Sequence, residues 1–155
     1  MRCLKVAKIE MKKIAQKALD DLEFGVVLEQ AALRCATALG KSQMMASIPS
    51  SDIGEVKKAL LRTNEYASSF SEEKPIPNHG FEDVSEEVSL LDVENSKIEV
   101  EGFRKLLLLV DTANTLIVFL KKNKDLYPTL FEATYEQVPI KEIPKEINRV
   151  VDKFG

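Results

Sequence analysis

The segment 98–122 constrains the fold more than any other part of the chain. Its apolar residues recur every three or four positions, the period of one helix face. They are Val100, Phe103, Leu106, Leu107, Val110, Ala113, Leu116, Ile117 and Leu120. Leu108, Leu109, Val118 and Phe119 make the remaining faces apolar as well. Because such a helix is typical of one enclosed by others, we predict a buried helix over 98–122, roughly 38 Å long, that carries most of the core.

Shorter helical patterns precede this segment. Apolar residues with helical spacing predict a helix near 14–22, a second over 26–39, one or two turns over 42–48 that Pro49 ends, and a helix over 53–67. Gly25 is a predicted boundary, and Gly40 is the predicted C-terminal cap of the second helix. Asp52 followed by Glu55 is a predicted capping box. The apolar face of the helix that it begins consists of Ile53, Val56, Ala59, Leu60, Thr63 and Ala67.

The chain after residue 67 alternates loops with short helices. The stretch 68–80 contains two prolines and a final glycine and predicts a loop. Further predictions are an amphipathic helix over 84–93 with Val84, Val88 and Leu91 inward, and a helix or turn over 126–131. An extended connector over 138–144 leads to a last helix with Pro144 in its first turn and an apolar edge. That edge consists of Ile143, Ile147, Val150 and Val151.

These patterns predict an all-α fold, a bundle of about six helices around the buried helix 98–122. We divide the chain into a dispensable N-terminal extension, 1–10, and one helical domain, 11–155. The chain carries 22 basic and 25 acidic residues, interspersed, with a formal net charge of −3, which argues against a large phosphate-binding surface. Two distant cysteines, Cys3 and Cys35, together with an N-terminus that lacks the apolar core of a secretory signal, indicate reduced thiols and a cytoplasmic protein.

Membrane insertion is not expected either. The nearest candidate for a spanning segment, 106–120, is interrupted by Asp111 and Asn114, and a span needs about 18 consecutive apolar residues.

Two motifs suggest chemistry only weakly. Gly40-Lys41-Ser42 resembles the end of a phosphate-binding loop, but that motif needs a glycine where Cys35 stands, and a strand before it. His79, the only histidine, lies in a loop beside Glu82 and Asp83. A metal or acid–base site would require those carboxylates to converge on it, so a solvated loop residue is favoured.

Other reactive side chains also have structural explanations. Cys35 lies on the apolar stripe of its predicted helix, which favours a buried thiol over a reactive one. Carboxylate pairs at predicted helix starts or on polar faces are explained by the helix dipole. These pairs are Asp20/Asp21, Glu86/Glu87 and Glu99/Glu101. The run Lys121, Lys122 and Lys124 complements the end of the long helix, with contact to a nucleic-acid backbone as the alternative. We therefore predict no catalytic, cofactor-binding or metal-binding residue.

An ordered set of short motifs resembles the N-terminal part of the type II branch of the MutS family. The first group comprises Leu22-Glu23-Phe24, Leu28, Ala36, Leu39-Gly40-Lys41, Pro49, Asp52, Val56, Leu60 and Thr63-Asn64-Glu65. The second comprises Phe81-Glu82-Asp83-Val84, the helix from Ile98, Tyr127-Pro128-Thr129-Leu130 and the segment Ile147–Gly155. The resemblance covers nearly the whole chain from about Met11.

The resemblance implies a dimeric, DNA-associated ATPase that combines a helical core, long clamp arms, a P-loop ATPase module and a Smr nuclease module. Such proteins are associated with suppression of recombination through branched-DNA binding, or with splitting stalled ribosomes, and are related to mismatch-repair proteins. The P-loop, Walker B and Smr motifs have no counterpart in these 155 residues. The resemblance thus implies a non-catalytic core or lever segment that stops before the clamp arms.

What this segment works with follows from the same resemblance. Its implied partners are the rest of a MutS-type chain and, through that chain, branched DNA or a ribosome. ATP, magnesium and dimerisation would belong to the modules absent here.

Two other hypotheses stay open. The first is a stand-alone helical adaptor that binds a partner protein. The second is a small hydrolase in which His79 meets acidic residues in a cleft.

Overall fold

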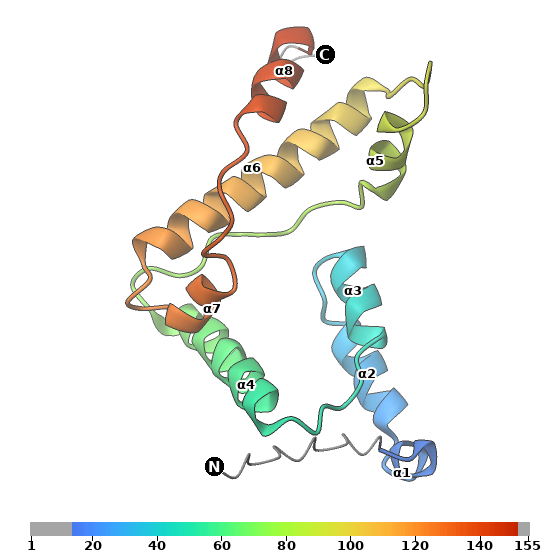
Figure 1. Cartoon of the computed structure of the whole chain (residues 1–155), viewed down its shortest axis with the longest axis vertical. Coiled ribbons are helices and arrows are strands. Elements are labelled where there is room, and N and C mark those ends of the chain that lie inside the picture. The colour runs from blue at the N-terminus through green and yellow to red at the C-terminus, as the bar shows by residue number, and fades with distance from the viewer. Residues whose placement is uncertain (1–13, 152–155) are drawn as a thin grey trace, which may run out of the picture.

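The structure, a computed structural model, describes residues 14–151, without the side chain of Val150, and its regular elements in this range are all helical (Figure 1). The described residues form eight α-helices, one 3₁₀ turn and no strand. Their bounds are α1 (Gln16–Asp21), α2 (Phe24–Ala32), α3 (Ala38–Met45), α4 (Ile53–Ser68), η1 (Ser69–Ser71), α5 (Ser85–Leu91), α6 (Val100–Lys122), α7 (Pro128–Glu132) and α8 (Glu142–Val150). The all-α prediction is confirmed, with more helices than the six expected.

The helices pack in two groups rather than around one centre. In the first group α1 packs on α2 and α2 on α3. In the second, α6 packs on α5, α7 and α8, and α7 also packs on α4. Figure 1 shows α2 and α3 side by side, apart from the long diagonal of α6. The prediction that the front helices surround the long helix is wrong for the described residues, because none of α1–α4 packs on α6.

The long helix itself forms where the periodicity places it. It begins at Val100, two residues later than predicted, and ends at Lys122. One face is buried, through Gly102, Leu106, Val110 and Leu120. Leu108 and Val118 on other faces are 49% and 53% exposed. The prediction of a helix enclosed on all sides is therefore wrong, because the three short helices that pack on α6 leave these side chains uncovered.

The core joins α6 to the segments on either side of it in the chain. Val84, Leu106 and Ile147 form the buried cluster, and Ile98, Phe103, Leu107, Leu109 and Val151 pack against it. Val88 and Leu91, which we predicted to point inward, are exposed. Of the three predicted inward residues only Val84, immediately before α5, is buried.

The apolar stripe over 26–39 is broken into two helices. α2 ends at Ala32, and α3 begins at Ala38 after Thr37, whose Oγ1 accepts a hydrogen bond from the Gly40 backbone N–H at 3.0 Å. Gly40 is therefore the third residue of a helix and not a C-terminal cap, which corrects our prediction. A capping hydroxyl satisfies a backbone N–H that a new helix leaves without a partner, so Thr37 can begin a helix within an apolar run.

The boundary predicted at Gly25 lies two residues earlier. Glu23, with a φ of 52°, precedes α2 in the left-handed region. Such a conformation interrupts a helix, and it separates α1 from α2.

The predicted cap at Asp52 is confirmed. Its Oδ1 accepts from the backbone N–H groups of Gly54 at 2.7 Å and Glu55 at 3.0 Å. The reciprocal half of the capping box runs through Ser50, whose hydroxyl donates to Glu55 and accepts from the Asp52 backbone N–H. The apolar face of α4, in contrast, is exposed along its length.

The C-terminal predictions hold in outline. The loop over 68–80 forms, with the short turn η1 at its start, and Pro144 lies in the first turn of α8. The connector before α8 is tied to α6 by Asn114, whose side chain donates to the Ile140 carbonyl and accepts from the Ile140 N–H, both at 2.7 Å. The predicted extension 1–10, Cys3 and residues 152–155 lie outside the described residues.

Candidate functional site

The phosphate-loop alternative for Gly40-Lys41-Ser42 finds no support in the geometry. The three residues lie inside α3, and the Gly40 N–H already donates to Thr37. The element before them is α2, a helix, where a phosphate-binding loop follows a strand.

His79 contacts an aromatic side chain and a backbone carbonyl. Its Nδ1 lies 3.0 Å from the Pro77 carbonyl oxygen and its Nε2 lies 3.2 Å from the Tyr66 hydroxyl. Because a carbonyl only accepts, Nδ1 carries the proton, and in the neutral ring Nε2 then accepts from Tyr66. The Asp83 carboxylate is engaged elsewhere, with Ser85. His79 thus fastens the loop to the end of α4.

Cys35 lies in the turn between α2 and α3 and not on a helix, contrary to the prediction. It is a free, partly exposed thiol, and its Sγ lies 3.7 Å from the Ala31 carbonyl oxygen. The prediction of a buried thiol is therefore wrong, because the helix on whose apolar stripe we expected Cys35 ends at Ala32.

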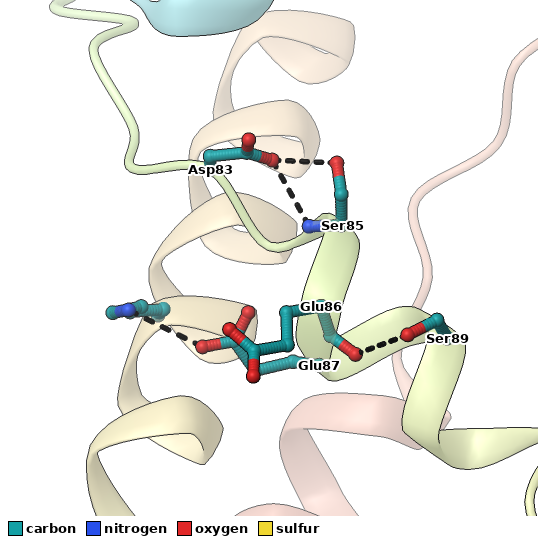
Figure 2. A network of polar contacts seen from close by, with 6 residues as sticks. Asp83, Ser85, Glu86, Glu87 and Ser89 are labelled. Atoms are coloured by element: carbon teal, nitrogen blue, oxygen red, sulfur yellow. Dashed lines mark hydrogen bonds and ion pairs between the residues drawn. The ribbon is translucent and has the colours of Figure 1, made fainter.

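The acidic residues around α5 form a structural network with α6 (Figure 2). Asp83 accepts from the backbone N–H of Ser85 at 3.0 Å and from its hydroxyl at 2.6 Å, and the hydroxyl bond is the main cause that lowers the pKa of Asp83. Glu87 Oε1 lies 3.2 Å from Lys105 Nζ on α6. This hydrogen bond, together with the negative charge of Glu87, raises the pKa of Lys105.

The remaining predicted groups also lie where helix stability explains them. Glu86 and Glu87 are in the first turn of α5, and Glu101 is in the first turn of α6. Asp20 accepts from Gln16 one turn earlier in α1. Lys121 and Lys122 are in the last turn of α6, as the dipole argument expects.

The site that sequence analysis missed is a joint at α7. Both carboxylate oxygens of Glu65, on α4, accept from the Thr129 backbone N–H, at 2.9 and 3.0 Å, and Oε2 also accepts from the Leu130 N–H at 3.0 Å. A carboxylate here complements the exposed N–H groups and positive end of the helix. One sequence signal existed: α7 begins after Tyr127, which offers no capping side chain, so its first N–H groups needed an acceptor from elsewhere.

A second contact holds the start of α7. Tyr127 is 1% exposed, its hydroxyl donates to the Lys74 carbonyl at 2.8 Å, and its ring lies 5.8 Å from that of Phe119 on α6. Burial is the main cause that raises the pKa of this phenol. Tyr127 thus ties three segments together: the start of α7, α6 and the 72–77 loop.

The joint links α4 to α6 through α7. Within residues 14–151, α4 and α6 both pack on α7 and not on each other. A displacement of α4 therefore reaches α6 through α7 or through the loop that connects the two helices in the chain.

Comparison of the chain with protein-family models, curated protein sequences and solved structures gives no match.

Two further observations concern the described part of the chain as a whole. It contains no cluster of three or more histidine, cysteine, aspartate or glutamate side chains placed to hold a metal ion. No helix in it has both the length and the apolar character needed to cross a bilayer.

Proposed function

We propose that this chain is a non-catalytic helical core, or lever, segment of a MutS-type, DNA-associated ATPase. The observation that carries the proposal is the α7 joint. Two motifs of the resemblance, Thr63-Asn64-Glu65 and Tyr127-Pro128-Thr129-Leu130, lie far apart in the sequence, and they contact each other there through Glu65. Contact between two matched motifs is what a shared core would require.

The physical role of such a segment is to transmit displacement. Close-packed helices deform little, and α6 is a continuous helix of 23 residues supported by α5, α7 and α8. A shift imposed on one end would move the other end rather than being absorbed along the way. In the proposal the driving shift comes from an ATPase module and the moved parts are clamp arms, both in the remainder of a MutS-type chain.

The parent protein would act in the cytoplasm on branched DNA or on ribosomes, in mismatch repair, suppression of recombination or ribosome rescue. ATP, magnesium and dimerisation would belong to its other modules. In the proposal His79 has a structural role, because its two ring nitrogens contact Tyr66 and Pro77 and hold the loop to α4.

A stand-alone helical adaptor is the second candidate. The exposed apolar side chains of α4 favour it, since Ile53, Leu60 and Leu61 are all more than half exposed. Adjacent exposed apolar side chains are typical of surfaces that meet another protein.

The experiment compares this chain with the complete reading frame that contains it. We expect the chain alone neither to hydrolyse ATP, nor to shift a four-way DNA junction in a gel, nor to sediment with ribosomes, whereas the full frame should hydrolyse ATP and bind one of the two. ATP hydrolysis by the chain alone would contradict the proposal. A reading frame without a P-loop, in a protein that binds a helical partner, would favour the adaptor.

A further inference from the structure

We infer that α4 is a releasable arm, with Glu65 as its latch on α7 and Tyr127 as the pivot that keeps α7 on α6. This inference concerns the fold and holds whichever of the two proposed functions is correct. The two contacts that meet at α7, through Glu65 and through Tyr127, differ in character.

The latch is one side chain that supplies three hydrogen bonds. Both oxygens of Glu65 accept from the first backbone N–H groups of α7. Hydrogen bonds to a charged group are stronger than those between neutral groups, and these bonds share a single carboxylate. Losing that carboxylate removes all of them together.

Apart from Tyr66 at its end, which contacts His79 in the following loop, α4 has few other contacts. None of its residues is buried. The one further ion pair to α7 joins Lys58 and Glu132 at 3.1 Å, with both side chains more than half exposed. Exposed ion pairs of this kind contribute little to stability, because solvent and salt screen the two charges. Glu65 is therefore the main polar contact that positions α4 against α7.

The pivot is different in kind. Tyr127 is buried, and it combines a hydrogen bond to Lys74 with ring contact to Phe119. Burial of an aromatic side chain contributes apolar contact that does not depend on one polar group. α7 should accordingly stay on α6 when α4 leaves.

The test uses pairs of spin labels in the whole chain, with Cys3 and Cys35 replaced by serine. Lys57→Cys and Lys121→Cys, both at exposed positions, report the distance between α4 and α6. Asp111→Cys and Ala133→Cys, also exposed, report the distance between α6 and the end of α7. Pulsed electron paramagnetic resonance gives the distribution of each distance.

With Glu65 intact, both distributions should be narrow. Glu65→Ala should broaden the α4–α6 distribution at least twofold and leave the α6–α7 distribution unchanged. Glu65→Gln keeps one acceptor oxygen and should broaden the first distribution less. Lys58→Ala, which removes only the exposed ion pair, is the matched control and should change neither.

Three results would overturn the inference. The first is an α4–α6 distribution that stays narrow in Glu65→Ala. The second is broadening of both distributions together, which would mean that α7 itself depends on Glu65. The third is loss of helical circular dichroism in Glu65→Ala, because the contact would then be integral to the fold and not releasable.

Discussion

The α2–α3 pair and the α6 group are both helical, but different interactions hold them. In α2 and α3 the one described capping bond is local, from Gly40 to Thr37, and the one buried side chain is that of Ala32. In the α6 group the contacts join segments far apart in the chain, through the cluster of Val84, Leu106 and Ile147. Local signals are thus enough to begin a helix, whereas burial between distant segments is what makes a group of helices rigid.

The largest expected effect is the loss of a core side chain in the α6 group. Leu106 is 8% exposed within the buried cluster, so Leu106→Ala should lower the free energy of unfolding by about 2–5 kcal/mol, from lost burial and the cavity left behind. Leu60→Ala is the matched control on α4, where the side chain is 63% exposed, and it should cost less than about 0.5 kcal/mol. Urea denaturation followed by circular dichroism measures both, and equal effects would contradict the comparison.

Two glycines give the next largest contrast. A Cβ at Gly102 would lie 2.8 Å from Ile98 Cγ2 and 2.9 Å from Glu87 Cγ, whereas one at Gly25 would meet nothing within 4 Å. Gly102→Ala should therefore destabilise the chain by about 1–3 kcal/mol through overpacking. Gly25→Ala should stabilise α2 by up to about 1 kcal/mol, because alanine favours a helix. Thermal unfolding midpoints measure both, and a midpoint that rises in Gly102→Ala would be evidence against close packing between α5 and α6.

Helix caps should matter in proportion to the N–H groups they satisfy. Asp52→Ala removes the acceptor for two N–H groups of α4 and should cost about 1 kcal/mol. Thr37→Ala removes one such bond in α3 and should cost less. Amide hydrogen exchange should rise locally in the first turn of the affected helix and stay unchanged in α6. A rise that reaches α6 would mean that the two regions unfold together.

The smallest effect concerns acid. Hydrogen bonds, chiefly from the Ser85 hydroxyl, lower the pKa of Asp83 below its ordinary value of 3.8. A carboxyl group whose pKa is lower in the folded state stabilises the fold at any pH above its pKa in the unfolded chain. This contribution is lost as the pH falls through its pKa in the folded state. Carboxyl NMR should place the Asp83 midpoint below 3.8, and Ser85→Ala should move it upward. A midpoint that Ser85→Ala leaves unchanged would remove the hydroxyl as the cause.

Sequence alone predicts what depends on local chemistry. The extent of α6 follows from its helical period, and the start of α4 follows from the cap at Asp52. The break at Thr37 was missed because the apolar stripe continues across it, so periodicity carried no sign of the cap.

Long-range packing was predicted less well. The apolar positions of α6 show which residues could be buried, but they do not show how many neighbouring helices cover them. For this reason the sequence predicts that Leu108 and Val118 are buried, although both are exposed. The α7 joint was missed because Glu65 and Thr129 are 64 residues apart. Only the folded chain shows that a carboxylate in one helix meets the uncapped start of another.

The most direct test of the account is native-state hydrogen exchange on the intact chain, resolved by helix. The amides of α6 between Leu106 and Leu120 should be the most protected, exchanging only when the whole α6 group opens. Those of α2 and α3 should exchange through local opening at a lower free energy. Equal protection of the two regions, or greater protection of α2 and α3, would contradict the claim that α6 and the helices packed on it form the more rigid part of this molecule.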